Sequence, residues 1–112
     1  MKLPGWLRQI TCGDAGVWGI NPLGDLYSFG DGGNVGWAQV KTNRNTFTWI
    51  SSGAIGKVWA VDEDGAVFRK GSDHEWIEVE GPGTKMMQVD VFNRTVWGVD
   101  INNQIWYRST TA

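Results

Sequence analysis

A chain of 112 residues, with 12 acidic and 10 basic side chains and a formal charge of −2, has the length of one domain and lacks the basic stripe that nucleic-acid binding requires. No apolar stretch reaches the roughly 20 residues of a membrane span, and the N-terminal residues show no signal-peptide layout. We therefore expect no membrane span. The single cysteine cannot form an internal disulfide, so we expect a cytoplasmic location, with secretion without a visible signal peptide as the alternative.

Tryptophan and glycine are unusually frequent, with 8 Trp and 16 Gly against only 3 Pro. So many indoles in a small chain indicate a core assembled from tryptophan, a surface that stacks on flat ligands, or both. The abundant glycine indicates many turns.

The first copy of a repeat occupies about residues 1–40. Four short runs of roughly four to six residues, rich in Val, Ile, Trp and Tyr, alternate with clusters of Gly, Asn and Asp. These runs are Leu7–Thr11, Gly16–Asn21, Gly24–Tyr27 and Trp37–Val40. Alternate residues of a strand face opposite sides, so Trp18 and Ile20 share one face of the second run. Four short strands in succession are typical of one blade of a β-propeller.

The same order of runs returns in a second copy, about residues 41–79, and in a third, about residues 80–112. Trp18, Trp59 and Trp97 mark one position in the three copies at a spacing of roughly 40 residues, which indicates a repeat architecture. The remaining runs are Phe47–Ser51, Lys57–Asp62, Gly65–Phe68, Trp76–Val79, Met86–Val91, Thr95–Asp100 and Asn103–Trp106. We predict a single all-β domain over residues 1–112, built from three four-stranded antiparallel propeller blades.

One turn recurs in each copy between the second and third runs, at Asn21–Gly24, Asp62–Gly65 and Asp100–Asn103. Each turn begins with Asn or Asp, whose side chain can accept hydrogen bonds from the following backbone. Each ends with Gly or Asn, which tolerate a positive φ. We therefore predict hairpin turns at these three places.

Particular motifs of the chain resemble the tectonin repeat, which is found in the tectonins, horseshoe-crab tachylectin-1 and the fish egg lectins. They are Leu3–Ile10 (LPGWLRQI), Gly13–Asn21 (GDAGVWGIN), Val96–Asp100 (VWGVD) and Gln104–Arg108 (QIWYR). The resemblance extends over almost the whole chain. The second copy departs from the pattern with Ala60 for Gly, Asp62 for Asn and Trp49-Ile50 for the Gln-Ile pair.

The resemblance implies a β-propeller, usually of six blades, that recognises carbohydrate. N-acetylglucosamine, methylated sugars and lipopolysaccharide are the ligand classes that it implies, and no cofactor is expected. Because intracellular tectonin-like domains act as interaction platforms, a non-catalytic protein–protein platform is the alternative function.

Catalytic groups are few. The one histidine, His74, lies in a polar loop, and the one cysteine, Cys12, follows an apparent strand, so a Cys–His dyad lacks a third orienting group. One His and one Cys do not complete a tetrahedral zinc site. The acids Asp62, Glu63 and Asp64 share one turn, whereas a glycosidase pair must flank a cleft from two sides. We expect neither an enzyme nor a metal site.

A sugar site needs an aromatic platform for the C–H face of the sugar and fixed polar groups for its hydroxyls. The five tryptophans at aligned positions are expected in the blade cores: Trp18, Trp37, Trp59, Trp76 and Trp97. Trp6 and Trp49 lie outside these positions and are therefore ligand candidates. The complete set of candidate ligand-binding residues is Trp6, Asn21, Tyr27, Trp49, Asp62, Phe68, Arg69, Asp100, Trp106, Tyr107 and Arg108.

Three blades are too few for a ring, since propellers close at about four to eight. Two copies give six blades, so we expect a homodimer that closes a six-bladed propeller. The third copy reaches Ala112 without a counterpart of Trp76–Val79, and Lys2–Gly5 matches the end of that missing run. We therefore predict that Met1–Leu3 of one subunit pairs with the third blade of the other, which would give multivalent glycan binding.

Overall fold

A computed structural model describes residues 2–3, 5–30, 36–42, 46–72 and 75–110. These residues form eleven strands and no helix: β1 (Gln9–Gly13), β2 (Gly16–Ile20), β3 (Leu26–Phe29), β4 (Trp37–Val40), β5 (Phe47–Ser52), β6 (Val58–Asp62), β7 (Val67–Lys70), β8 (Trp76–Val79), β9 (Met86–Phe92), β10 (Thr95–Asp100) and β11 (Ile105–Ser109). No described segment is a helix with the length and hydrophobicity of a membrane crossing.

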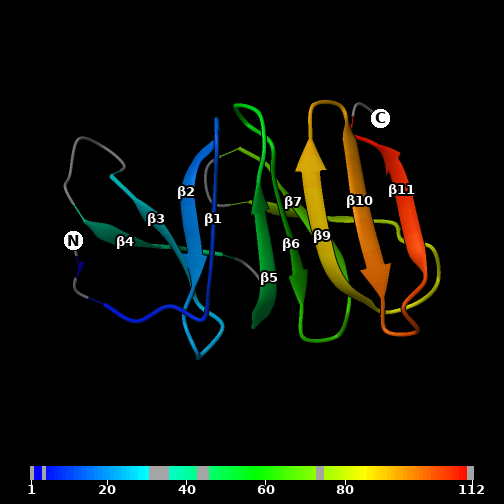
Figure 1. Cartoon of the computed structure of the whole chain (residues 1–112), viewed down its shortest axis with the longest axis horizontal. Coiled ribbons are helices and arrows are strands. Elements are labelled where there is room, and N and C mark those ends of the chain that lie inside the picture. Colours follow the sequence, from blue (N-terminus) through cyan, green and yellow to red (C-terminus); the bar gives the residue numbers. More distant parts are fainter. Residues whose placement is uncertain (1, 4, 31–35, 43–45, 73–74, 111–112) are drawn as a thin grey trace.

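The strands form three antiparallel sheets that stand side by side (Figure 1). The first sheet has the order β1-β2-β3-β4, the second β5-β6-β7-β8, and the third, as far as it is described, β9-β10-β11. Each sheet is a meander in which consecutive strands are neighbours. The all-β fold and its propeller-like blades are thus confirmed. The pairing predicted for Met1–Leu3 involves Met1, which lies outside the described residues, and Leu3 is exposed.

The three predicted hairpin turns have one structure. In the first, the side-chain Oδ1 of Asn21 accepts the backbone N–H groups of Leu23 at 3.0 Å and Asp25 at 2.9 Å. Asp62 and Asp100 accept bonds from the corresponding positions of their own turns. The last turn residue has a positive φ in each case: 88° at Gly24, 79° at Gly65 and 65° at Asn103.

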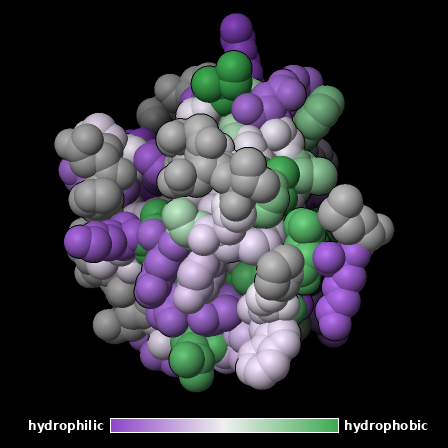
Figure 2. Space-filling model, turned by 90° about the vertical axis from the view of Figure 1, so that its left-hand side faces the viewer, coloured by the Kyte–Doolittle hydropathy of each residue, from purple (hydrophilic) through white to green (hydrophobic). Residues whose placement is uncertain are grey.

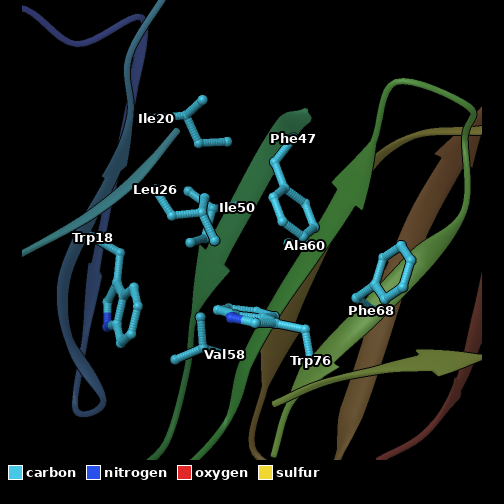
Figure 3. Packing of buried hydrophobic residues seen from close by; sticks show 9 residues of the cluster. All are labelled: Trp18, Ile20, Leu26, Phe47, Ile50, Val58, Ala60, Phe68 and Trp76. Atoms are coloured by element: carbon cyan, nitrogen blue, oxygen red, sulfur yellow. The ribbon is translucent and has the colours of Figure 1, made fainter. Parts of the chain in front are cut away.

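A first core fills the space between the first and second sheets (Figure 3). The first sheet contributes Trp18, Ile20 and Leu26, and the second contributes Phe47, Ile50, Val58, Ala60, Phe68 and Trp76. The indole of Trp76, from β8, meets that of Trp18 edge to face, with 6.2 Å between the ring centroids. Truncation of a buried aromatic of this size costs about 3–5 kcal/mol, so this joint between sheets is a large part of the stability of the fold.

A second core repeats the arrangement between the second and third sheets. The second sheet contributes Trp59, Val61 and Val67, and the third contributes Met86, Val89, Val91 and Val96. Trp97 was predicted in a core, but 50% of this residue is exposed. Its side chain faces away from the second sheet, and no other described sheet packs against that face.

Candidate functional site

A hollow of about 390 Å³ lies between β11 and the segment that connects β8 to β9. Its walls include Trp106 and Arg108 on one side and Val79, Glu80 and Pro82 on the other, with Trp59 at its base. At the first joint, Trp76 of β8 contacts Trp18, the counterpart of Trp59. The third sheet has no counterpart of β8 among the described residues, and the space stays open.

Asp100 fixes the orientation of Trp106. The Oδ2 atom of this fully buried carboxylate accepts the indole N–H at 2.9 Å, while Oδ1 accepts the two backbone bonds of the turn. The bond from Trp106 and then the backbone bonds from Gln104 and Asn102 hold the pKa of Asp100 below its usual value, against the opposing effect of burial. The hydrogen bond to Asp100 therefore orients the indole of Trp106 in the wall of the hollow.

Arg108 lies on the same side of the hollow as Trp106. Its Nη1 donates a hydrogen bond to the backbone oxygen of Glu80 at 2.9 Å, which ties β11 to the β8–β9 connection. The other guanidinium N–H groups leave charged donors beside the aromatic wall. Because Trp106 and Arg108 pair with Gly98 and Val96 of β10, both lie on the sheet face that looks toward the second sheet.

Tyr107, between these two residues, lies on the other face of the sheet. Its ring stacks on Trp97, with centroids 4.8 Å apart and 21° between the planes, and 70% of its surface is exposed. Trp106 and Arg108 thus lie on the face toward the second sheet and Tyr107 on the other face, although Tyr107 also contributes to the lining of the hollow.

A second hollow of about 460 Å³ lies at the opposite end, on the first sheet. It brings together three predicted residues, Trp6, Asn21 and Tyr27, with Leu7 and Trp37. Trp6 is 87% exposed, and the Asn21 amide lies 3.5 Å from the Tyr27 hydroxyl. The hollow is apolar and aromatic, with this amide and hydroxyl as its polar groups.

Two predicted ligand residues belong to the interior instead. Phe68 is only 2% exposed and lies edge to face with Phe47 in the first core, so the aromatic position of β7 faces a neighbouring blade and not a ligand. Trp49 donates its indole N–H to the backbone oxygen of Val89 at 2.9 Å and packs against the second core. Both side chains thus contribute to packing between sheets.

The Asn/Asp position also serves the fold, since Asn21, Asp62 and Asp100 close their own turns. Asp62 lies beside a small hollow of about 250 Å³ that Trp106 does not reach. Arg69 is half-buried on β7, opposite Trp59, and lines neither aromatic hollow. These two residues are therefore separated from the sites at Trp106 and Trp6.

The residues that face Trp106 across the hollow were not predicted from the sequence. Val79 ends the second copy and Pro82 lies at the start of the third, far in sequence from Trp106, so alignment of the copies does not bring them together. The turn sequence Gly81-Pro82-Gly83 was the available signal, because it marks a sharp connection after β8. His74 lies outside the described residues, and Cys12 is a free, exposed thiol.

The comparisons with known proteins point to one sequence family. The family described as Tectonin domain matches residues 1–72 and 46–112, which together span the whole chain. No curated protein sequence matches the chain.

Solved structures share the fold at low sequence identity. The crystal structure of human WBSCR16 superposes with a TM-score of 0.70 at 14% identity, over 97% of this chain and 34% of that one. A structure of YCF48 bound to D1 peptide gives 0.62 at 17% identity, over 99% and 37% of the two chains. A streptogramin B lyase structure gives 0.54 at 19% identity, over 92% and 40%. The chain thus spans a third to two fifths of these propeller proteins.

Proposed function

The chain belongs to the tectonin-domain family, and we propose that it is a lectin, a non-catalytic protein that binds carbohydrate in the hollow between Trp106, Arg108 and Pro82. The observation that carries the proposal is an indole, hydrogen-bonded to Asp100, beside a guanidinium on the same face of β11. The indole would stack on the C–H face of a sugar ring, and the guanidinium would donate to its hydroxyl, amide or phosphate oxygens.

The dimensions of the site suit a small ligand. Ligand pockets are concave and mostly apolar, with a few polar groups that fix orientation, and they begin at about 300 Å³. A hollow of about 390 Å³ accommodates one or two sugar rings. N-acetylglucosamine, methylated sugars and the sugars of lipopolysaccharide all present an apolar face beside an oxygen acceptor, so these are the classes to test.

Assembly would multiply the site. We propose that two copies close a six-bladed ring, which would carry two such hollows and gain avidity for arrayed glycans. The free thiol of Cys12 suits a reducing compartment, so the cytoplasm is the proposed location and secretion the alternative.

Glycan binding by purified protein tests the function. We expect Arg108→Ala to weaken binding on an array of N-acetylglucosamine, methylated sugars and lipopolysaccharide by roughly tenfold, because a charged hydrogen bond contributes about 1.5–3 kcal/mol. The exposed Arg94 lines neither hollow, so Arg94→Ala is a matched control that should bind as the wild type does. Absence of binding to every glycan class, or equal affinity for Arg108→Ala and wild type, would contradict the proposal.

A protein-interaction platform is the second candidate, favoured by the likeness to a propeller solved with a bound peptide. A partner retained from native lysate in the presence of saturating free sugar would support it. Retention that free sugar abolishes would support the lectin.

A further inference from the structure

The joint between the first and second sheets is closed by side chains that bond the backbone of the next sheet. The amide of Gln9, on β1, donates to the backbone oxygen of Ile50 at 2.8 Å and accepts from its N–H at 2.7 Å. Two residues further along, the Thr11 hydroxyl accepts the N–H of Ser52 at 3.1 Å. Side chains of β1, the first strand of one sheet, thus form hydrogen bonds with the backbone of β5, the first strand of the next.

The joint between the second and third sheets repeats these bonds at aligned positions. Trp49 replaces Gln9 and donates to the oxygen of Val89, which is the counterpart of Ile50. Ser51 replaces Thr11 and accepts the N–H of Val91 at 3.0 Å. At the turns, the Gly24 and Gly65 carbonyls accept the N–H groups of Phe47 and Met86, both at 3.0 Å. Both joints therefore have hydrogen bonds at the same repeat positions.

On the two end sheets, the positions that form these hydrogen bonds between sheets are exposed. On β9, Gln88 and Asp90 occupy the positions of Gln9 and Thr11, and both are exposed. On β1, Ile10 and Cys12 occupy the positions of Ile50 and Ser52, and both are exposed. No bond from these four residues to another sheet is found in the described part of the chain, apart from one between Asp90 and Ser51 of the neighbouring sheet.

We infer that a second copy of the chain joins these two ends, with Gln88 of one copy bonded to the backbone of Ile10 in the other and Asp90 accepting the N–H of Cys12. This inference rests on the proposed six-bladed ring and specifies its register. It does not depend on sugar binding.

The side chains of the end sheets support the same register. Trp18, Ile20 and Leu26 face the second sheet in the first core, and their counterparts on the third sheet are exposed or half-buried: Trp97, Val99 and Ile105. On the second sheet, Phe47, Phe68 and Trp76 pack against these first-sheet side chains in the first core. Their counterparts by position on the first sheet are Leu7, Tyr27 and Trp37. These last three residues line the 460 Å³ hollow.

The hollow on the first sheet is therefore the surface that the second copy would contact. By analogy with the contact between Trp18 and Trp76, Trp97 of one copy would meet Trp37 of the other. Figure 2 looks onto the end of the molecule that the first sheet forms, where hydrophobic and pale side chains lie among hydrophilic ones. Such a mixed face agrees with a joint that combines aromatic packing with backbone hydrogen bonds.

Two is the copy number that closes this ring. Propellers have about four to eight blades, so two copies with six blades fall within the range, whereas three copies with nine do not. The two joints of the dimer are equivalent, and the twofold axis runs along the centre of the ring.

A disulfide trap tests the register directly. The chain has one cysteine, so Asp90→Cys places a single new thiol opposite Cys12 of the second copy. We expect mild oxidation to give a covalent dimer and no longer species, because a closed ring uses every thiol. The exposed turn residue Asp64 provides the control, and Asp64→Cys should give no such dimer. A ladder of larger species would overturn closure by two copies, and absence of the dimer would overturn the register.

Gln88→Ala provides a second test that requires no new bond. It should raise the dissociation constant of the dimer by roughly tenfold or more, measured by analytical ultracentrifugation, because each dimer loses the amide bonds at both joints. Gln104 is another exposed glutamine, and Gln104→Ala should leave the dimer unchanged. A wild-type monomer, or equal dimer stability in Gln88→Ala and wild type, would refute the inference whether or not the protein binds sugar.

Discussion

At the scale of single residues, Asp100 connects the fold to the proposed site. Its carboxylate closes the last hairpin turn through Oδ1 and holds the Trp106 indole through Oδ2. The corresponding residue of the first sheet is Asn21, whose amide lies near the Tyr27 hydroxyl instead. In the third copy, the carboxylate at this position thus also accepts the tryptophan N–H, whereas Asp62 in the second copy faces an aligned phenylalanine, which has no such donor.

The lowered pKa of Asp100 predicts a pH-dependent contribution to stability. A carboxylate with a lowered folded-state pKa stabilises the fold above the ordinary pKa of about 3.9, and this stabilisation is lost as the pH falls through the folded-state pKa. Asp100→Asn keeps an oxygen for the turn but removes the acceptor for Trp106. We expect it to be less stable than the wild type at pH 7, with a difference that narrows at pH 3.

Urea unfolding at the two pH values measures this difference. Asp64 is exposed in the turn of the second sheet, so Asp64→Asn controls for the loss of one negative charge. A stability difference between Asp100→Asn and wild type that is the same at pH 7 and pH 3 would show that the Asp100 charge does not stabilise the fold.

At the scale of the elements, the joint between the first two sheets depends on a close backbone approach at Gly13. A Cβ atom added there would overlap the carbonyl oxygen of Ser52 and lie 2.9 Å from that of Gly53. Because both obstacles are backbone atoms of β5 and its end, Gly13→Ala can be accommodated only by separating the sheets. We expect a loss of about 1–3 kcal/mol in the free energy of unfolding.

Gly81 is the matched control, because a Cβ at this position meets no atom within 4 Å and its φ is not positive. Thermal and urea unfolding of Gly81→Ala should therefore follow the wild type. If Gly13→Ala were equally stable, the sheets would not be held at the separation that the structure gives.

The repeat made the elements predictable, and the limits of prediction arise where one copy meets the next. The spacing of Trp18, Trp59 and Trp97 predicts the strands, and the Asn/Asp turns follow from local chemistry. Burial was not equally predictable: Trp97 was expected in a core but is exposed, and Phe68 was expected at a site but is buried. Phe68 is covered because the first sheet lies against its face, and Trp97 is open because no described sheet lies against its face.

The binding hollow was partly predictable for the same reason. Trp106 and Arg108 were recognised because an aromatic and a cation follow each other on one strand. The opposite wall, Val79 and Pro82, comes from the boundary between the second and third copies, and its place depends on how the sheets are stacked. No periodicity within a single copy contains that information.

At the scale of the whole molecule, an isolated chain leaves large hydrophobic side chains exposed at both ends. Trp97 and Ile105 are exposed on the third sheet and Ile10 on the first, although soluble proteins usually cover such faces. The inferred ring buries both ends at once, so the stability of each chain should depend on its partner. Anything that binds only the folded state makes the melting temperature depend on its concentration, and here the binding partner is a second copy.

We therefore expect the melting temperature to rise with protein concentration. A tenfold increase contributes about 1.4 kcal/mol per dimer, and for a folding unit of two such chains this shifts the melting temperature by about 3 °C. Differential scanning calorimetry over a hundredfold range of concentration measures the effect. The disulfide-linked dimer of Asp90→Cys carries its partner covalently, so its melting temperature should not vary with concentration. A wild-type melting temperature that is constant across that range would mean that the exposed ends are stable without a second copy.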